Sequence, residues 1–403
     1  MPTRSRPAAA LIGWLSLAQL ISWGSVFYTF AVLLGPVEQA LQLSRAEVSL
    51  GFSLALLAEG LLAWPVGRLI DRGHERAVMT GGSLLLALGL ALHSAVDSRA
   101  GFYAVWLLLG AGLAATLYQP AFAVLTRRFP DGFRRAIITM TFLGGLASTV
   151  FIPLSAWLIG ALGWRGALLV LAALHLLVCA PIHALLLRGA PPPLAQADGH
   201  AGAPPVALRQ HLLSAPFLLI GVFIVLLMAV TAALPAHLVS LLRENGLAEA
   251  WVIAVPASIG VLQVLGRLLL YFFEHRLDRH QTNRLIPVFV PLGLLALLLA
   301  PWAGPAQLAV LLLFVLLFGM GNGMLTIVKG TAVAEYVSRA HVATLNGALG
   351  LPMALARAAA PLLLGLLWRP DGGYTVGLWL LLALSLLGLG ALIAAQRLAR
   401  RRR

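Results

Sequence analysis

Residues 216–242 read PFLLIGVFIVLLMAVTAALPAHLVSLL, a stretch without a single Asp, Glu, Lys or Arg. About 20 consecutive apolar residues are enough for an α-helix to cross the hydrocarbon core of a bilayer. A stretch of this length without charge therefore predicts a transmembrane helix. Similar apolar stretches make up most of the chain. The fold class predicted for this segment, a membrane-spanning helix, therefore applies to most of the sequence.

The composition extends the same prediction to the whole chain. Its 403 residues are 60% hydrophobic and only 10% charged, which excludes a soluble globular protein. Hydropathy and turn residues predict an all-α membrane protein of twelve transmembrane helices, arranged as two six-helix bundles. The expected helix ranges are 11–35, 46–69, 77–96, 101–126, 136–159, 165–187, 213–242, 249–273, 285–301, 306–330, 342–367 and 374–396.

The long break between the two sets of six helices contains APPPLAQADGHAGAPP, from position 190 to 205. Such a Pro-, Ala- and Gly-rich segment is typical of a flexible linker. We therefore expect an N-terminal bundle at 1–187, a cytoplasmic linker at 188–212 and a C-terminal bundle at 213–403. A shift of about 204 residues places Arg135-Ala136 on Arg339-Ala340, which favours two parallel repeats.

The basic residues predict the orientation in the membrane. Of the 28 basic residues, five fall in the predicted outer loops, three lie within helices, and the rest are on the inner side. This bias predicts that both termini are cytoplasmic. It also explains the net charge of +14 without nucleic-acid binding. Heavy Ala, Leu and Arg usage favours a bacterium, where the location would be the inner membrane, and the first apolar stretch is a spanning helix, not a signal peptide.

Three basic residues lie well inside predicted helices: Arg267, Lys329 and Arg357. A cation at that depth costs several kcal/mol unless an anion or a polar partner compensates it. Structural alternatives are a bridge from Arg267 to Gln263 or to a backbone carbonyl, a helix-to-helix hydrogen bond from Arg357, and snorkelling of Lys329 to the interface. With three cations against the single acidic residue Glu59, the membrane core favours an anionic substrate.

Glu59 lies in the second predicted helix, two turns before Gly67. A carboxyl group surrounded by low dielectric is a candidate for carrying a proton during transport. A permanent salt bridge to one of the three cations is the alternative role.

The sequence lacks the common motifs for nucleotide binding, metal-dependent hydrolysis and thiol redox chemistry. It has no GxxxxGK[ST] phosphate loop, no HExxH and no CxxC, and its lone cysteine, Cys179, cannot form an intramolecular disulfide. We therefore expect no enzyme activity, no cofactor and no metal site. Transport would draw on ion or substrate gradients.

The loop between the second and third predicted helices, residues 67–76, reads GRLIDRGHER. This spacing resembles the loop motif of the major facilitator superfamily. The resemblance covers nearly the whole chain and implies the major facilitator fold, with transport by alternating access. Gly67 is expected to let two helices approach closely. Asp71, Arg72 and Arg76 are expected to form charge-assisted contacts that act in gating.

A narrower resemblance is to the monocarboxylate transporter and oxalate/formate antiporter branch. It rests on SWGSVFYTFAVLLGPVEQALQLSRAEVSL at 22–50, TRRFPDGFRRAIITMTFLGGLASTVFIPL at 126–154, and GRLLLY at 266–271. The resemblance implies that Arg267 binds a substrate carboxylate. The chain departs from the family at Gln263 and Tyr271, and its first helix has no lysine, so the substrate and the proton coupling stay open.

Neutral polar residues complete the predicted site. The resemblance implies that the first, fourth, seventh and tenth helices line the cavity, which favours Tyr28, Tyr118, Gln119 and Asn322 as substrate contacts. Tyr118 and Asn322 also match at the shift of about 204 residues, as expected near a pseudo-twofold axis. Helix-to-helix hydrogen bonding is the alternative role for each.

The sequence thus predicts a monomeric secondary transporter of a small, monocarboxylate-like organic anion, with protons as a candidate second substrate. Its partners are the anion and membrane lipid. One alternative is a proton-driven exporter of hydrophobic drugs that uses Glu59 to recognise cations. An alternative of another class is a membrane sensor without transport.

Overall fold

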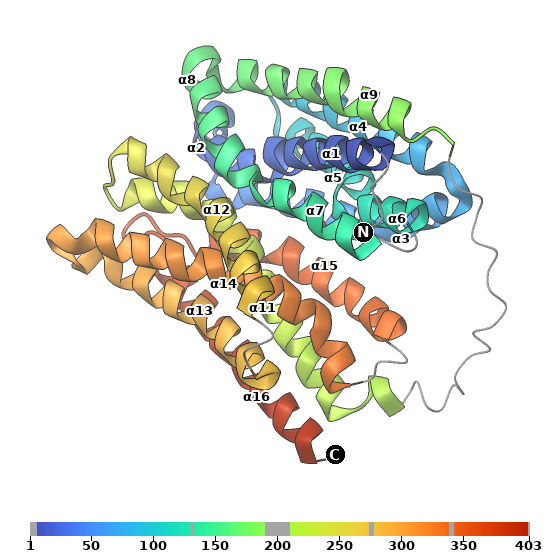
Figure 1. Ribbon diagram of the computed structural model, residues 1–403. Coiled ribbons are helices and arrows are strands. Elements are labelled where there is room, and N and C mark those ends of the chain that lie inside the picture. Colours follow the sequence, from blue (N-terminus) through green and yellow to red (C-terminus); the bar gives the residue numbers. More distant parts are fainter. Residues whose placement is uncertain (1–5, 130–132, 190–209, 274–277, 338–341, 402–403) are drawn as a thin grey trace. The chain divides into compact units, whose positions relative to one another are not determined.

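The structure is a computed structural model that describes residues 6–129, 133–189, 210–273, 278–337 and 342–401 (Figure 1). Within these residues the chain is α-helical apart from short turns and one isolated bridge between Arg369 and Gly373. The all-α fold predicted from hydropathy is confirmed. The chain divides into two compact units, Met1–Ala195 with Ala236–Ser240, and Gln196–Pro235 with Leu241–Arg403.

The first half of the chain forms the blue-to-green helices of Figure 1. Its elements are α1 (Arg6–Ser22), the π-helical η1 (Trp23–Tyr28), α2 (Thr29–Leu41), α3 (Arg45–Leu69), the π-helical η2 (Ile70–His74), α4 (Glu75–Ser94), α5 (Arg99–Thr116), α6 (Tyr118–Arg128), α7 (Phe133–Gly145), α8 (Ala147–Leu174), the π-helical η3 (His175–Cys179) and α9 (Ala180–Leu186).

The second half forms the yellow-green-to-red helices. Its elements are α11 (Ala215–Glu244), α12 (Glu249–Phe273), α13 (Arg279–Leu299), the short 3-10 turns η5 (Ala300–Trp302) and η6 (Gly304–Ala306), α14 (Gln307–Tyr336), α15 (Val342–Leu366) and α16 (Thr375–Arg401).

Eleven segments of the described residues are long and apolar enough to cross a membrane. One of them, Thr139–Leu186, has 48 residues and would be about 72 Å long as a straight helix, more than twice the hydrocarbon thickness. Gly163 interrupts this segment with a φ of 71° and a ψ of 166°, which is not helical. The predicted number of twelve helices therefore depends on counting this segment as two crossings.

Short polar residues start several helices. Ser44 and Glu47 form a capping box at the start of α3, in which each side chain binds the other residue's backbone N–H. Ser98, Ser214 and Asp278 accept backbone N–H bonds at the starts of α5, α11 and α13. The connections between spans are thus short and well defined where they are described.

Large apolar side chains lie both inside and outside the bundles. Phe30, Phe52 and Trp106 are fully buried in the first unit, where Phe30 stacks on Phe52 at 4.4 Å between ring centroids. Leu177 and Trp302, by contrast, are exposed to 70% and 72%. Exposed apolar surface on every span is expected when lipid, and not water, surrounds the helices. The chain is a multi-pass membrane protein.

Candidate functional site

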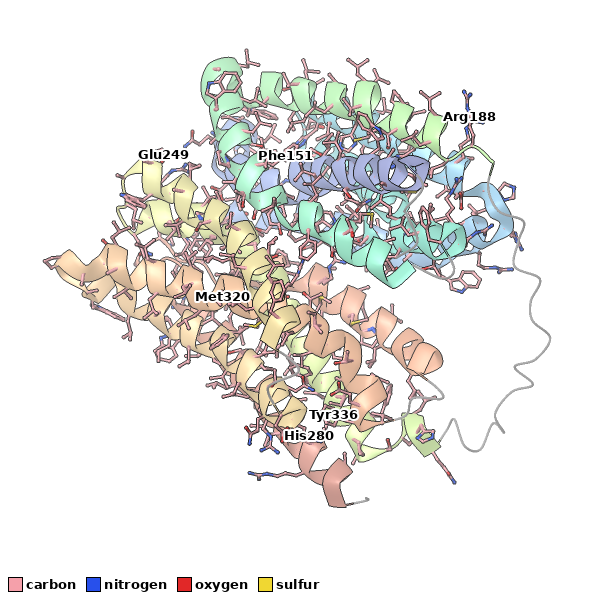
Figure 2. All side chains as sticks on the ribbon, viewed as in Figure 1. Phe151, Arg188, Glu249, His280, Met320 and Tyr336 are labelled. Carbon is pink, nitrogen blue, oxygen red and sulfur yellow. The ribbon has the colours of Figure 1, made fainter. Side chains whose placement is uncertain are left out.

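Glycines bring α12 and α14 into close contact in the second unit. A Cβ atom on Gly266 would lie 2.6 Å from the Met320 carbonyl oxygen, and one on Gly323 would lie 2.7 Å from the Gln263 Cα. No side chain fits at such distances, so only glycine permits this approach of the two backbones. The Gly-rich sequence GMGNGM at 319–324 thus positions α14 directly against α12 (Figure 2).

This close approach determines where the Arg267 side chain lies. Arg267 follows Gly266 on α12, is half-buried, and donates its Nε–H to the Gly323 carbonyl oxygen at 3.3 Å. The bond is the backbone-carbonyl contact named above as the structural alternative. It fixes the guanidinium beside α14, one residue from the predicted contact Asn322.

Lys329 and Arg357 lie on the neighbouring helices α14 and α15, which pack together. Both side chains are half-buried, and their positive charges are close enough to interact electrostatically. Within the part of the chain that the structure describes, the Lys329 ammonium forms no hydrogen bond or ion pair. The structure therefore places two of the three predicted cations on adjoining helices, where like charges repel.

A polar stripe leads along α14 to this pair of cations. Asn322, Thr326 and Lys329 are spaced by four and three residues, so they follow one another on the same face of the helix. The Thr326 hydroxyl donates to the Asn322 carbonyl oxygen at 3.1 Å. All three side chains are at least partly exposed.

The predicted site residues of the first unit lie on three different segments. Glu59 is half-buried on α3, and Tyr28 is half-buried at the end of η1, beside Phe27. Tyr118, at the start of α6, packs its ring 5.1 Å from that of Trp23, and its Cε1 would lie 3.1 Å from a Cβ on Gly144 of α7. Gln119 is exposed. The Tyr118 ring thus packs against Trp23 and against Gly144 of α7.

The loop motif is built differently from the prediction. A Cβ on Gly67 would meet no described atom within 4 Å, so the described residues show no close helix approach at this glycine. The glycine that the loop requires is Gly73, which has a φ of 90° within η2, just before α4. Arg72 is exposed, while Arg76 donates its Nε–H to the Ala184 carbonyl oxygen of α9 at 2.7 Å. The side chain of Asp71 lies outside the described residues.

A buried charge cluster centred on Glu75 of this motif was not predicted. The Glu75 carboxylate is fully buried and pairs with Arg128 Nε at 2.6 Å and with Arg127 Nε at 3.8 Å. Arg127 also donates to the Ile70 carbonyl oxygen, and Arg128 donates to the Arg188 carbonyl oxygen. The cluster joins α4 to the end of α6 within the first unit. An acidic residue in a basic loop, together with a double arginine at a helix end, was the available signal.

A second unpredicted network joins the ends of three helices in the second unit. Asn283 of α13 donates to Glu335 at 2.6 Å and to the Tyr336 hydroxyl at 2.9 Å, both on α14. Gln396 of α16 donates to the same hydroxyl at 3.0 Å, and the His280 ring lies 5.8 Å from the Tyr336 ring (Figure 2). Burial raises the pKa of the Tyr336 phenol above its ordinary value.

A buried polar seam crosses the first unit where two π-helical segments meet. Ser25 of η1 bonds to His175 of η3 at 2.7 Å, and Thr29 bonds to Ser155 of α8 at 2.6 Å. No pattern in the sequence assigns His175 a role, because its partner is 150 positions away. The seam satisfies polar groups that would otherwise be costly in a membrane helix.

Comparisons with known proteins agree with this arrangement. A sequence model of the Major Facilitator Superfamily matches residues 15–361. Monocarboxylate transporter 13 of Bos taurus is 30% identical over 418 aligned residues, which cover 98% of this chain and 91% of that protein. An MFS-type efflux pump of Mycolicibacterium smegmatis is 28% identical over 305 residues, which cover 72% of this chain and 68% of the pump.

Among solved structures, a point mutant of the nucleoside transporter NupG superposes with a TM-score of 0.77 at 16% identity, over 96% of this chain and 99% of that one. This likeness supports the fold. The family model and the monocarboxylate transporter relative both cover most of the sequence. The chain therefore belongs to the major facilitator superfamily, in its monocarboxylate transporter branch, and is a membrane transporter, not an enzyme.

Proposed function

We propose that the chain is a secondary transporter of a small organic anion, similar to a monocarboxylate, that works by alternating access. The observation that carries this proposal is the pair of neighbouring cations Lys329 and Arg357 on α14 and α15. Two like charges in a low-dielectric region repel, and an anion bound beside them relieves the repulsion. An anionic substrate is therefore the ligand that these helices favour.

The distribution of acidic residues supports the same conclusion. Every acidic residue of the second half lies at a helix end or in a connection: Glu244, Glu249, Glu274, Asp278, Glu335 and Asp371. Negative charge in the sequence of the second half is therefore confined to the ends of its spans. In the proposed site, Arg267, Lys329 and Arg357 bind the carboxylate, and Asn322, Tyr28, Tyr118 and Gln119 contribute neutral contacts.

In the same proposal Glu59 carries the coupling proton. It is the acidic residue placed within a span of the first unit, away from the helix ends. We propose that Asp71, Arg72 and Arg76 act at the inner surface during gating. The orientation that follows from the basic loops places both termini in the cytoplasm of a bacterial inner membrane, with the linker at 188–212 between an N-terminal and a C-terminal bundle.

A second candidate function has one specific observation in its favour. The relative from Mycolicibacterium smegmatis is an MFS-type efflux pump. On this alternative the chain exports hydrophobic cations, and the Glu59 carboxylate recognises them. The three cations of the second unit disfavour such a substrate, because they raise the free energy of any positive ligand placed near them.

A thermal-shift panel on purified protein separates the two functions. Monocarboxylates, dicarboxylates and cationic drugs are compared on the wild type, Arg267→Ala, Lys329→Ala and Glu59→Gln. Carboxylates should raise the Tm of the wild type and Glu59→Gln, and this rise should be lost in Arg267→Ala and Lys329→Ala. Arg243→Ala, at a partly exposed helix end, serves as the arginine control and should respond like the wild type. Stabilisation by cationic drugs alone, abolished in Glu59→Gln, would establish the exporter instead.

A further inference from the structure

A groove lined by apolar residues lies on the surface of the second unit, between α11 and α16. Its volume is about 690 Å³. Its lining includes Leu219 of α11 and, from α16, Ala383, Leu386, Leu387, Gly390 and Ala394. Leu386 and Leu387 are 51% and 62% exposed, so the groove opens to the surrounding membrane. The transport function described above uses none of these residues.

The groove follows one face of α16 from Ala383 to Ala394 and passes the point where α16 touches α11. At Gly388 they touch, because a Cβ there would collide with the side chain of Leu227 and would lie 3.7 Å from the Phe223 carbonyl oxygen. From this contact the lining continues toward Ala394 on α16 and toward Leu219 on α11. The helices therefore run in opposite directions, and one end of the groove lies toward the C-terminus of α16 and the N-terminus of α11. The small side chains of Gly390 and Ala394 leave room that larger residues would fill.

Positive charge is concentrated at this same end. Arg397 is exposed and lies three residues after Ala394 and seven after Gly390, so it continues the groove face of α16. The sequence from 372 to 403 contains no acidic residue. The N-terminus of α11 adds the positive end of a helix dipole.

We infer that this groove binds an anionic phospholipid, with an acyl chain along α16 and the headgroup phosphate at Arg397. An apolar slot that ends at the Arg397 guanidinium matches a molecule with an apolar tail and a negative head. A second copy of the chain fits less well. A twofold interface through this face, with its axis along the membrane normal, would place the Arg397 residues of the two copies side by side.

The test uses full-length protein purified in a neutral detergent and depleted of lipid. Phosphatidylglycerol and phosphatidylcholine with identical acyl chains are titrated, and bound lipid is counted by native mass spectrometry alongside the Tm. The wild type should bind phosphatidylglycerol more tightly and gain more Tm from it. Arg397→Ala should weaken the binding of phosphatidylglycerol about fivefold, since a basic residue near a membrane surface contributes about 1 kcal/mol. Its affinity for phosphatidylcholine should not change.

Two further variants separate this groove from general lipid binding. Ala394→Leu fills the groove and should weaken both lipids while leaving the ratio of their affinities in place. Arg369→Ala removes an exposed arginine that precedes α16 and should bind both lipids like the wild type. Equal affinity for the two lipids in the wild type, or an unchanged preference in Arg397→Ala, would overturn the inference. So would a dimer that Ala394→Leu dissociates without any effect of lipid.

Discussion

The ammonium of Lys329 is the most informative single group in the protein. Lys329 lies on the spanning helix α14, and its positive charge interacts with that of Arg357 on α15. Each positive charge makes the charged form of the other less stable. Replacing Lys329 with Met removes the charge and keeps most of the side-chain volume. We predict that Lys329→Met raises the Tm of the ligand-free protein, because the repulsion is removed, and reduces the additional Tm gained from a carboxylate. Both effects are read in one thermal-shift experiment.

Thr326→Val is the control for that change. Thr326 is exposed on the same face of α14 and carries no charge. This variant should leave the ligand-free Tm and the carboxylate response close to wild type. A Lys329→Met protein that is less stable without ligand, yet fully stabilised by carboxylate, would show that Lys329 is a structural residue.

The buried Glu75 carboxylate gives a second prediction at the residue scale. Its partners Arg127 and Arg128 are 4% and 12% exposed, so its loss leaves two poorly solvated cations. Removing one partner of a buried ion pair costs about 3–5 kcal/mol. We predict that Glu75→Gln lowers the Tm strongly and reduces the yield of folded protein. Thermal unfolding followed by far-UV circular dichroism measures the change.

A matched control for Glu75 exists in the second unit. Glu249 pairs with Arg243 at 2.6 Å, but the two side chains are 63% and 44% exposed. An exposed pair is worth less than about 1 kcal/mol, so Glu249→Gln should barely change the Tm. Equal losses from Glu75→Gln and Glu249→Gln would refute the importance of burial for the cluster.

The site residues show what could be predicted from the sequence at this scale. Arg267, Lys329 and Arg357 were identifiable because a charge inside an apolar run is unusual wherever it occurs. Glu75 was not identified, although it lies inside the motif that pointed to the family. Its partners are more than 50 positions away, and hydropathy carries no information about such pairing. Spacing alone likewise does not show which glycine touches a neighbouring helix, and Gly323 and Gly266 were not singled out for that role.

At the scale of elements, the contact of α12 with α14 positions the candidate site. A methyl group on Gly323 would overlap the α12 backbone at Gln263, and backbone cannot move aside as a flexible side chain can. Overpacking of this kind costs about 1–3 kcal/mol. We predict that Gly323→Ala lowers the Tm by several degrees and weakens carboxylate binding, because Arg267 loses its place beside the Gly323 carbonyl. The Tm and the affinity for a carboxylate are both measured on the purified Gly323→Ala protein.

Gly67→Ala adds the same methyl group at a position with no described neighbour. The added methyl group meets no described atom within 4 Å, and alanine favours helix more than glycine does. This variant should be as stable as the wild type or slightly more so. A large loss of stability in Gly67→Ala, with none in Gly323→Ala, would contradict the packing described here.

The Tyr336 hydroxyl links α13, α14 and α16, and it gives a prediction about pH. Burial raises its pKa, so the folded state holds the phenol proton more tightly than the unfolded state. The resulting stabilisation is complete below the ordinary tyrosine pKa of about 10 and is lost as the pH rises above it. Wild-type protein should therefore lose more Tm between about pH 8 and pH 11 than Tyr336→Phe. An identical alkaline loss in both proteins would show that Tyr336 contributes nothing to the pH dependence.

Helix positions were predicted well, but their irregularities were not. The apolar run at 213–242 corresponds to α11, and 249–273 matches α12. Hydropathy did not indicate the π-helical turns η1 and η3, nor the interruption of α5 and α6 at Leu117, because these depend on polar contacts and packing between distant segments. Those irregular segments are where Tyr28 and Tyr118 lie.

For the whole molecule, composition was enough to predict the class. A chain that is 60% hydrophobic with short polar connections has few folds open to it, and the family comparison confirms the one expected. The choice of substrate depends on the few polar and charged side chains within these otherwise apolar helices. The surplus of cations in α12, α14 and α15 is therefore the feature on which the proposed function rests.

Counterflow in proteoliposomes tests the role of that surplus in transport itself. Vesicles containing purified protein are loaded with an unlabelled monocarboxylate, and uptake of the labelled compound from outside is followed over time. We predict transient accumulation of label in wild-type vesicles and its loss in Arg267→Ala and in the Lys329→Met, Arg357→Met double variant, whereas Arg243→Ala behaves like the wild type. Undiminished counterflow in both site variants, or no counterflow of any mono- or dicarboxylate in the wild type, would contradict the proposed anion transport.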